Sequence, residues 1–283
     1  MQNLNTFNVH GGHDAQGRGA SGACSNIKNV GWFYESVEDR NVKDDVIDLL
    51  RKNEKTAYDC TVDAAGTQQD NLYQIVTKCN AHKVDRDISI HFNSGRDDVN
   101  GDGDNAGVEV WLYDDSDQQL VKEAERICAN ISKLGFDNRG VKFDKELYVL
   151  RNTKAKAMLI ECCFVDDKDD VDLYRKVGSR AIAKAIVEGV LNTSINESSS
   201  SSNASNSKVY KIVTGGLGSR EVAEKKAAEI RDLFNWYIEV KENDGNSNDF
   251  RLETGGFTGI SKVEKKMNAL QELTGWWMVY QEE

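Results

Sequence analysis

Apolar residues recur at helical spacing in three parts of the first two thirds of the chain. The clearest case places Val42, Val46, Leu49 and Leu50 on one face of residues 42–50, and the same pattern runs over 120–134 and about 170–191. Short runs of β-forming residues lie between these helices, at 57–62, 87–92, 107–112 and 157–164. This alternation predicts an α/β domain with a twisted, mostly parallel sheet and helices on both faces.

The predicted strand at 87–92 separates its side chains by type. Ile88, Ile90 and Phe92 share one face, whereas Ser89 and His91 share the other. In sheets of this kind ligands bind beyond the carboxyl ends of the strands. His91 therefore lies where a ligand site is expected, and so do His13 and Glu161, which come at or just after strand ends.

The pattern changes after residue 191. Residues 192–207 are rich in Ser and Asn and poor in apolar residues, which predicts a flexible linker between a first domain at 1–191 and a second at 208–283. The second domain contains an internal repeat, because the segment from Tyr210 through Thr214-Gly215-Gly216 recurs from Phe250 through Thr254-Gly255-Gly256.

Each repeat, 208–247 and 248–283, has the pattern strand, turn, helix, strand. One such unit cannot bury its own apolar face, so we expect the two to pair into a small α+β domain of two βαβ repeats. The aromatic pairs Trp236-Tyr237 and Trp276-Trp277 fall in the last strand of each unit, where alternation turns one ring of each pair inward. We expect Tyr237 and Trp277 to be the exposed members.

Composition narrows the class of partner. The chain has a formal net charge of −11, so nucleic acid is not expected as a partner, because phosphate binding needs concentrated Lys and Arg. No apolar run reaches transmembrane length, so membrane insertion is not expected. The first residues show neither a basic region nor an apolar core of the kind that marks a secretory signal peptide.

Four residues carry the types of side chain that a zinc hydrolase uses: His13, Glu35, His91 and Glu161. Two imidazoles and one carboxylate form an open zinc site, and a second carboxylate can act as a base. Their spacing alone does not establish a site. Glu161 is the most informative of the four, because a carboxylate inside the apolar run at 158–164 is costly to bury unless it is paired, protonated or near a metal ion.

Each of the other three has an alternative reading. Taken alone, His91 fits a buried histidine that is hydrogen-bonded to backbone better than it fits a ligand. His10 competes with His13, and Glu38 competes with Glu35, whose carboxylate is also explained by the dipole at a helix N-terminus. His82 follows a predicted helix end, which favours a structural role.

Residues 1–191 resemble the zinc-dependent N-acetylmuramoyl-L-alanine amidases of type 3, in the form found in phage endolysins of Gram-positive, clostridial-type hosts. The matching stretches occur in the family's order and cover the whole first domain: Gly12-His13 with 19–22, Glu35 leading into a helix with Asn41, 89–93, and 159–161 with Phe164-Val165. The resemblance implies one Zn²⁺ per chain held by His13, Glu35 and His91, with Glu161 as the catalytic base. Residues 208–283 resemble the repeated wall-binding tails of some clostridial and bacillus endolysins.

The resemblance implies a peptidoglycan hydrolase that cleaves the amide bond between N-acetylmuramic acid and L-alanine and lyses the cell. Peptidoglycan, and secondary wall polymers besides, are then the expected partners. Such an enzyme is made in the host bacterial cytoplasm, exported through a separate pore protein, and acts on the cell wall. Two alternatives remain: a non-catalytic wall-binding protein with a degenerate amidase scaffold, and a zinc peptidase that acts within the stem peptides.

Residues 98–109 match the spacing of an EF-hand calcium loop, from Asp98 to Glu109. Position eight is Asn105 where an apolar residue is usual, and the flanking segments have the patterns of strands and not of helices. We therefore favour an acidic loop over a Ca²⁺ site.

Overall fold

The computed structural model describes residues 4–195, 209–234, 236–243, 246–258 and 260–282, and they form two compact units, Met1–Ser200 and Ser201–Glu283. The predicted linker at 192–207 lies outside the described residues from residue 196 onward. No helix within the described ranges combines the length and the apolar composition needed to cross a membrane.

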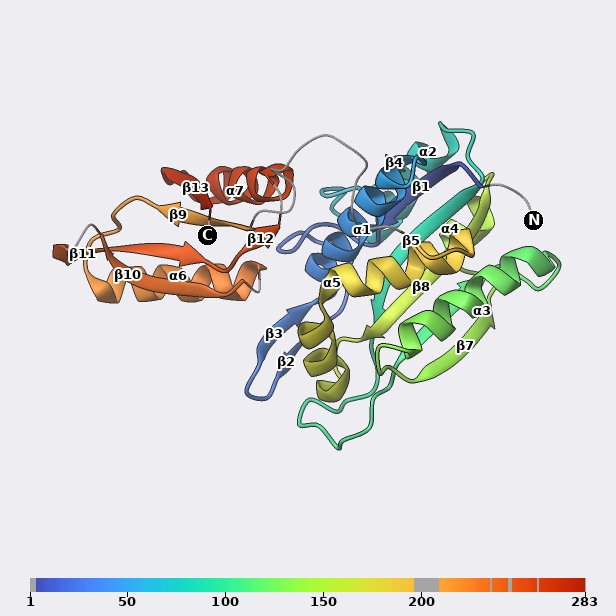
Figure 1. Cartoon of the computed structure of the whole chain (residues 1–283), viewed down its shortest axis with the longest axis horizontal. Coiled ribbons are helices and arrows are strands. Elements are labelled where there is room, and N and C mark those ends of the chain that lie inside the picture. The colour runs from blue at the N-terminus through green and yellow to red at the C-terminus, as the bar shows by residue number, and fades with distance from the viewer. Residues whose placement is uncertain (1–3, 196–208, 235, 244–245, 259, 283) are drawn as a thin grey trace. The chain divides into compact units, whose positions relative to one another are not determined.

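The first unit is built on a six-stranded sheet with the order β4-β1-β5-β8-β6-β7 (Figure 1). Neighbouring strands are parallel, except that β6 and β8 are antiparallel. The strands are β1 (Thr6–Gly11), β4 (Thr56–Asp59), β5 (Arg86–Asn93), β6 (Val108–Leu112), β7 (Asn138–Phe143) and β8 (Lys156–Phe164). The prediction of a mostly parallel sheet flanked by helices is confirmed.

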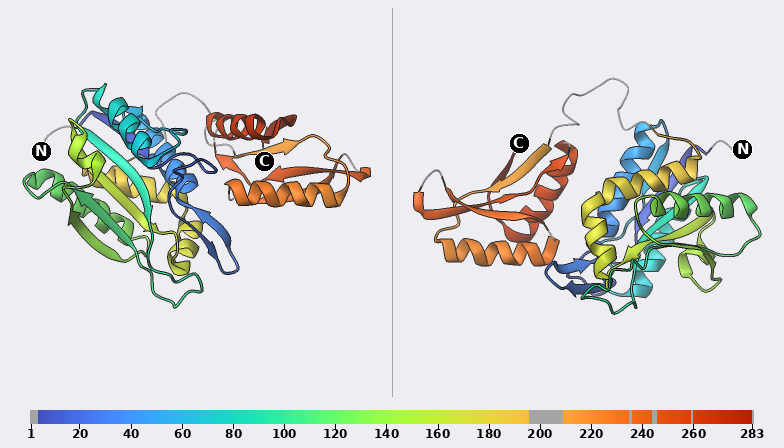
Figure 2. Two further views of the ribbon diagram at one scale, coloured as in Figure 1. Left: turned by 180° about the vertical axis from the view of Figure 1, so that it is seen from behind. Right: turned by 60° about the horizontal axis from the view of Figure 1, so that its bottom comes forward.

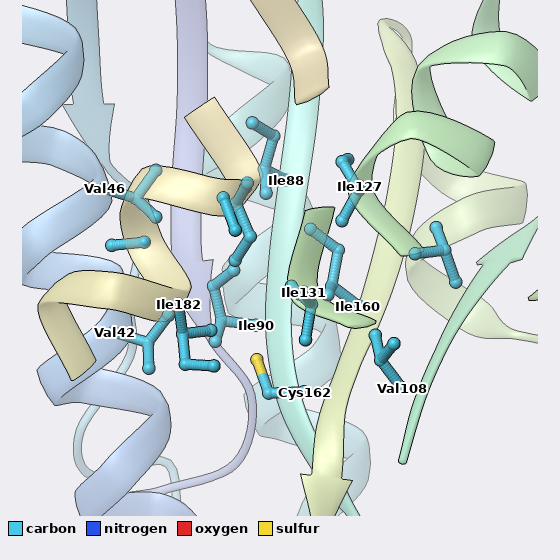
Figure 3. Packing of buried hydrophobic residues seen from close by; sticks show 14 of the residues in the cluster. Val42, Val46, Ile88, Ile90, Val108, Ile127, Ile131, Ile160, Cys162 and Ile182 are labelled. Atoms are coloured by element: carbon cyan, nitrogen blue, oxygen red, sulfur yellow. The ribbon is translucent and has the colours of Figure 1, made fainter. Parts of the chain in front are cut away.

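Three helices and the sheet face that they cover form the main core (Figures 1 and 3). They are α1 (Glu35–Lys52), α3 (Gln118–Ser132) and α5 (Lys168–Leu191). The alternating residues Ile88, Ile90 and Ile160 point into this layer and are at most 1% exposed. Burying each such side chain contributes roughly 1.5–3 kcal/mol.

The opposite face of the sheet is covered by α2 (Gln68–Asn80) and the short α4 (Tyr148–Asn152), as the view from behind shows (Figure 2). Ala157 and Leu159 of β8 pack into this second, smaller core. His91 and Glu161 alternate with the main-core residues of their strands, so they belong to this face. Two of the candidate functional residues, His91 and Glu161, therefore lie on the side of the sheet that α2 and α4 cover.

A two-stranded hairpin of β2 (Cys24–Ile27) and β3 (Gly31–Tyr34) precedes α1 and was not predicted. The edge strand β7 was not predicted either, because its residues are mostly exposed or half-buried and show no apolar run. The predicted helix at 42–50 is longer in the structure, since α1 begins at Glu35.

The first half of the second unit has the order strand, helix, strand, and the second half has the same order with one additional short strand before its helix. The first half contains β9 (Val209–Thr214), α6 (Arg220–Phe234) and β10 (Ile238–Asn243); the second contains β11 (Asn246–Thr254), β12 (Phe257–Thr258), α7 (Ile260–Thr274) and β13 (Met278–Glu282). β9 pairs with β11, β12 and β13, and β10 pairs with β11. Among the described strands, every ladder of this sheet therefore joins the first half to the second.

The two Thr-Gly-Gly turns are packed reciprocally. The Gly215 N–H donates to the Trp277 carbonyl at 3.0 Å, and the Gly255 N–H donates to the Tyr237 carbonyl at 2.8 Å. Tyr237 is 67% exposed and Trp277 is 69% exposed, whereas Trp236 is only 9% exposed. The expectation that Tyr237 and Trp277 are the exposed aromatic residues is confirmed.

Candidate metal centre

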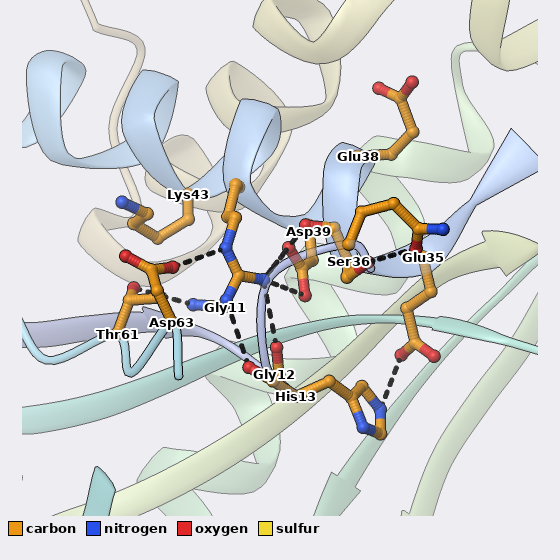
Figure 4. A network of polar contacts seen from close by, with 12 residues as sticks. Gly11, Gly12, His13, Glu35, Ser36, Glu38, Asp39, Lys43, Thr61 and Asp63 are labelled. Carbon is orange, nitrogen blue, oxygen red and sulfur yellow. Dashed lines mark hydrogen bonds and ion pairs between the residues drawn. The ribbon is translucent and has the colours of Figure 1, made fainter. Parts of the chain in front are cut away.

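Three side chains from separate elements converge beyond the carboxyl ends of β1 and β5. His13 follows β1, Glu35 opens α1, and His91 lies near the end of β5. One ligand atom of each lies within 4.8 Å of the others. His13 Nε2 is 3.2 Å from Glu35 Oε1, and His91 Nδ1 is 3.0 Å from the same oxygen. Figure 4 shows the imidazole of His13 directed at the carboxylate of Glu35.

Two glycines give these side chains their space. A Cβ at Gly12 would lie 1.9 Å from Cε1 of His91, and a Cβ at Gly22 would lie 2.6 Å from Oε2 of Glu35 and 2.7 Å from Cδ2 of His13. Gly22 also has a φ of +76°, a backbone conformation that residues with a side chain rarely adopt. At Gly12 and Gly22 the backbone therefore lies so close to the three side chains that only glycine fits.

Backbone N–H groups fix the carboxylate. The Ala23 N–H donates to Oε2 of Glu35 at 2.8 Å, and the Phe92 N–H donates to Oε1 at 3.2 Å. Burial opposes ionisation of Glu35, but hydrogen bonds with His13 and His91 lower its pKa below the usual value. Burial lowers the pKa of His91, which favours the neutral imidazole that metal ligation requires.

The donor set suits a divalent cation. Two imidazole nitrogens and one carboxylate oxygen are the protein ligands of an open zinc site, which keeps a position for water or substrate. The three groups already converge on a single point, and Glu35 supplies a negative charge there. The residues present therefore fit a zinc ion.

Glu161 lies beside this group. In the register of the sheet, Glu161 of β8 lies opposite His91 of β5 on one side and opposite Glu109 of β6 on the other. Its Oε2 is buried without a hydrogen-bond partner among the described residues. Burial raises the pKa of Glu161 well above its usual value, and the carboxylates of Glu35 and Glu109 raise it further. A nearby divalent cation would oppose both effects.

The carboxylate of Glu109 is fully engaged elsewhere. It accepts hydrogen bonds from Asn93 at 2.8 Å, Trp111 at 3.1 Å and Arg139 at 2.7 Å. Both oxygens of Glu109 thus accept hydrogen bonds, whereas Oε2 of Glu161 accepts none from the described residues. Of these two neighbouring carboxylates, Glu161 is therefore the one that can accept a proton.

A cleft of about 370 Å³ opens onto these groups. His13, Glu35, His91 and Glu161 line it together with residues of α2, of α4 and of the segment after β5. The cleft thus combines three candidate metal ligands with a carboxylate that has one buried oxygen without a hydrogen-bond partner among the described residues.

Comparison with known proteins identifies the first unit. Residues 9–192 match the family described as N-acetylmuramoyl-L-alanine amidase, which is a family of hydrolases. The chain belongs to this family.

Individual relatives agree with this assignment. The chain is 33% identical over 190 residues to a protein of Clostridium perfringens (strain 13 / Type A), an alignment that covers 67% of this chain and 52% of the relative. It is 27% identical over 176 residues to the endolysin of Bacillus phage SPP1, covering 59% and 56% of the two chains. The chain thus spans about half the length of the curated relatives that it matches.

Solved structures show the same fold. The catalytic domain of the CD27L endolysin targeting Clostridia Difficile has a TM-score of 0.56 and 33% identity, and the match covers 68% of this chain and 99% of that one. An N-acetylmuramoyl-L-alanine amidase from Clostridium difficile 630 has a TM-score of 0.52 and 23% identity, with 68% and 97% covered.

The rival residues lie outside the converging group. His10 is 1% exposed, its Nδ1 lies 3.4 Å from Oγ of Ser89, and burial lowers its pKa to about 3. Oε2 of Glu38 accepts a hydrogen bond from the Tyr174 hydroxyl at 2.8 Å. His82 stacks on Tyr58 with ring centroids 3.9 Å apart. Each of the three side chains thus has a contact within the fold and is not one of the three converging groups.

The EF-hand arrangement is not formed among the described residues. Glu109, the twelfth residue of the motif, lies in β6 and binds Asn93, Trp111 and Arg139 as described above. The carboxylate of Asp98 instead lies near those of Asp167 and Asp169, at the start of α5. The side chain of Glu109 is therefore engaged by partners in and beside the sheet, and not by the acidic residues of the loop.

Sequence reasoning did not identify the residues that shape the loop beside His13. The carboxylate of Asp14 accepts hydrogen bonds from the N–H groups of Ala65 and Gly66 and from the Asn71 side chain at 2.7–2.9 Å. The position of Asp14 directly after His13 was the available signal. Its hydrogen-bond partners lie more than fifty residues away along the chain, and nothing in the sequence indicated that they contact Asp14.

Proposed function

We propose that this chain is a zinc-dependent N-acetylmuramoyl-L-alanine amidase that cleaves the bond between N-acetylmuramic acid and L-alanine in peptidoglycan. The observation that carries the proposal is the convergence of His13, Glu35 and His91 beside the unpartnered carboxylate of Glu161 in one cleft. Membership of the amidase family supplies the reaction class.

The roles of the residues follow from their chemistry. His13, Glu35 and His91 would hold one zinc ion, which when bound supplies positive charge to polarise the scissile carbonyl and to lower the pKa of water. Oε2 of Glu161 takes the proton of the attacking water and then passes it to the L-alanine nitrogen as the carbon–nitrogen bond breaks. The products are a lactyl carboxylate on the glycan strand and a stem peptide with a free amino terminus.

Two other readings are separated from this one by mass analysis of purified walls digested with the protein. New L-alanine amino termini support the amidase. Other new termini would indicate a zinc peptidase acting within stem peptides, and no new termini would indicate a degenerate, non-catalytic scaffold.

We further propose that the protein is an endolysin of a phage that infects a Gram-positive, clostridial-type host, and that it reaches the wall through a separate pore protein and lyses the cell. The endolysin names of two similar proteins support this reading. In this reading residues 208–283 bind the wall, and the linker at 192–207 keeps the amidase at high local concentration near its substrate.

The exposed aromatic residues of the second unit provide a test of wall binding. In the full chain carrying Glu161→Gln to prevent digestion, Tyr237→Ser together with Trp277→Ser should weaken binding to purified walls by about tenfold or more, because exposed aromatic side chains often dominate binding energy. Sedimentation of the protein with walls at increasing concentration measures the change.

Tyr73→Ser is the matched control, since Tyr73 is a 62% exposed aromatic residue of the amidase unit, and this variant should bind as the parent does. Equal sedimentation of the double variant and the parent would argue against these two contacts. Equal binding by residues 1–191 alone would refute the targeting role of the second unit.

A further inference from the structure

His13 has an unusual backbone conformation. Its φ of 60° lies in the left-handed region, which residues other than glycine seldom occupy. Such conformations persist where the surrounding structure holds them, and they gather at functional sites.

The guanidinium of Arg40 contacts the backbone on both sides of the His13 α-carbon. Its Nη1 lies 3.3 Å from the Gly12 carbonyl oxygen, and its Nη2 lies 3.1 Å from the His13 carbonyl oxygen. These two carbonyls belong to the peptide groups before and after His13, so one rigid group fixes both.

The same guanidinium reaches two further segments. Nη1 donates to the Ser36 carbonyl at 3.0 Å, in the first turn of α1 directly after Glu35, and Nη2 donates to the Val62 carbonyl at 3.2 Å. Arg40 thus joins the segment that carries His13 to the turn that carries Glu35.

Two acidic side chains contact the guanidinium of Arg40, and burial raises the pKa of one of them, Asp39, to about 8. Asp39 is 0% exposed and lies 3.0 Å from Nη1, and Asp63 lies 2.9 Å from Nε. A Cβ at Gly11 would lie 2.9 Å from the Asp39 carboxyl carbon, so glycine at this position leaves room for the pair. The planar guanidinium presents five N–H donors on three nitrogens to these six acceptor groups, so that the three acceptors at Nη1 share its two hydrogens, whereas a lysine ammonium has three donors on one atom.

We propose that Arg40 is a positioning residue for the metal centre, which holds His13 and Glu35 so that their ligand atoms converge before an ion binds. This inference rests on the proposed zinc site, but it concerns how the chain preorganises that site. Outer contacts that orient metal ligands typically change metal affinity by about 10–100-fold when they are removed.

The test measures metal binding by the full chain and does not depend on wall hydrolysis. Arg40→Lys should weaken zinc binding by about 10–100-fold in competition with a chromogenic chelator. When Co²⁺ replaces zinc, the visible absorption spectrum of the Arg40→Lys protein should also differ from that of the wild type, because the spectrum depends on the geometry of the metal ligands.

Arg86→Lys is the matched control. Arg86 forms another buried ion pair, with Glu123, in which the two side chains are 1% and 2% exposed. It lies at the start of β5, about 17 Å along the strand from His91. This variant should lower the melting temperature at least as much as Arg40→Lys, yet keep zinc affinity within about threefold and the cobalt spectrum unchanged.

A folded Arg40→Lys protein with wild-type zinc affinity and cobalt spectrum would overturn the proposal, as would an equal loss of affinity in Arg86→Lys. Should Arg40→Lys fail to fold, Asp63→Asn replaces it, since Asp63 is 68% exposed and contacts Nε of Arg40. That variant should weaken zinc binding by about threefold or more, and unchanged binding would again overturn the proposal. A wild-type protein that binds no zinc would instead refute the proposed function itself.

Discussion

Glu161→Gln is expected to leave the protein folded and able to bind zinc, while slowing wall hydrolysis by about 10²–10⁴-fold, the usual cost of losing a general base. The substitution keeps the shape of the side chain but removes its ability to take up a proton. Glu161 is outside the group of three converging ligands, so the metal should stay. The rate of appearance of L-alanine amino termini, together with the zinc content of the purified protein, measures both effects.

Glu38→Gln is the control for this experiment, because Glu38 is also a buried glutamate but does not line the cleft. It should retain activity within about threefold. A Glu161→Gln protein that digests walls within about threefold of wild type would show that Glu161 is not the base.

His13→Ala and His91→Ala should each remove zinc and activity together, because each takes away one of three protein ligands. The loss of zinc affinity should exceed the about 10–100-fold that is typical for contacts outside the ligand shell. Elemental analysis after dialysis measures the zinc content, and a chelator should reproduce the loss of activity in the wild type, with recovery when zinc is added back.

His10→Ala should behave differently. Its ring is buried and lies outside the converging group, so the variant should lose stability but keep its zinc. If His10→Ala lost the metal while His13→Ala kept it, the ligand assignment would move by three residues.

The sequence was most informative where burial and charge conflict. Glu161 stands in an apolar strand, and the cost of burying a carboxylate there singles it out from the sequence alone as a candidate for a functional residue. Alternation likewise placed His91 on the face opposite Ile88 and Ile90, and it identified Tyr237 and Trp277 as the exposed aromatic residues.

The remainder of the site depends on contacts that leave no pattern in the sequence. Arg40 acts on backbone carbonyls of three segments, and any residue type offers a carbonyl, so no motif announces the contact. The EF-hand spacing failed for a related reason. A spacing rule cannot register that Glu109 belongs to a strand, where its side chain is directed to Asn93 and Arg139.

The pairing of strands in the second unit bears on how this part of the chain arose and how it holds together. Since its described ladders all cross between the halves, each half supplies the partner strands that the other lacks. This is the bonding pattern of a symmetric dimer whose two subunits have been fused into one polypeptide. A half taken alone would need a second copy to complete its sheet, and a chain that carries both halves removes the dependence of this assembly on protein concentration.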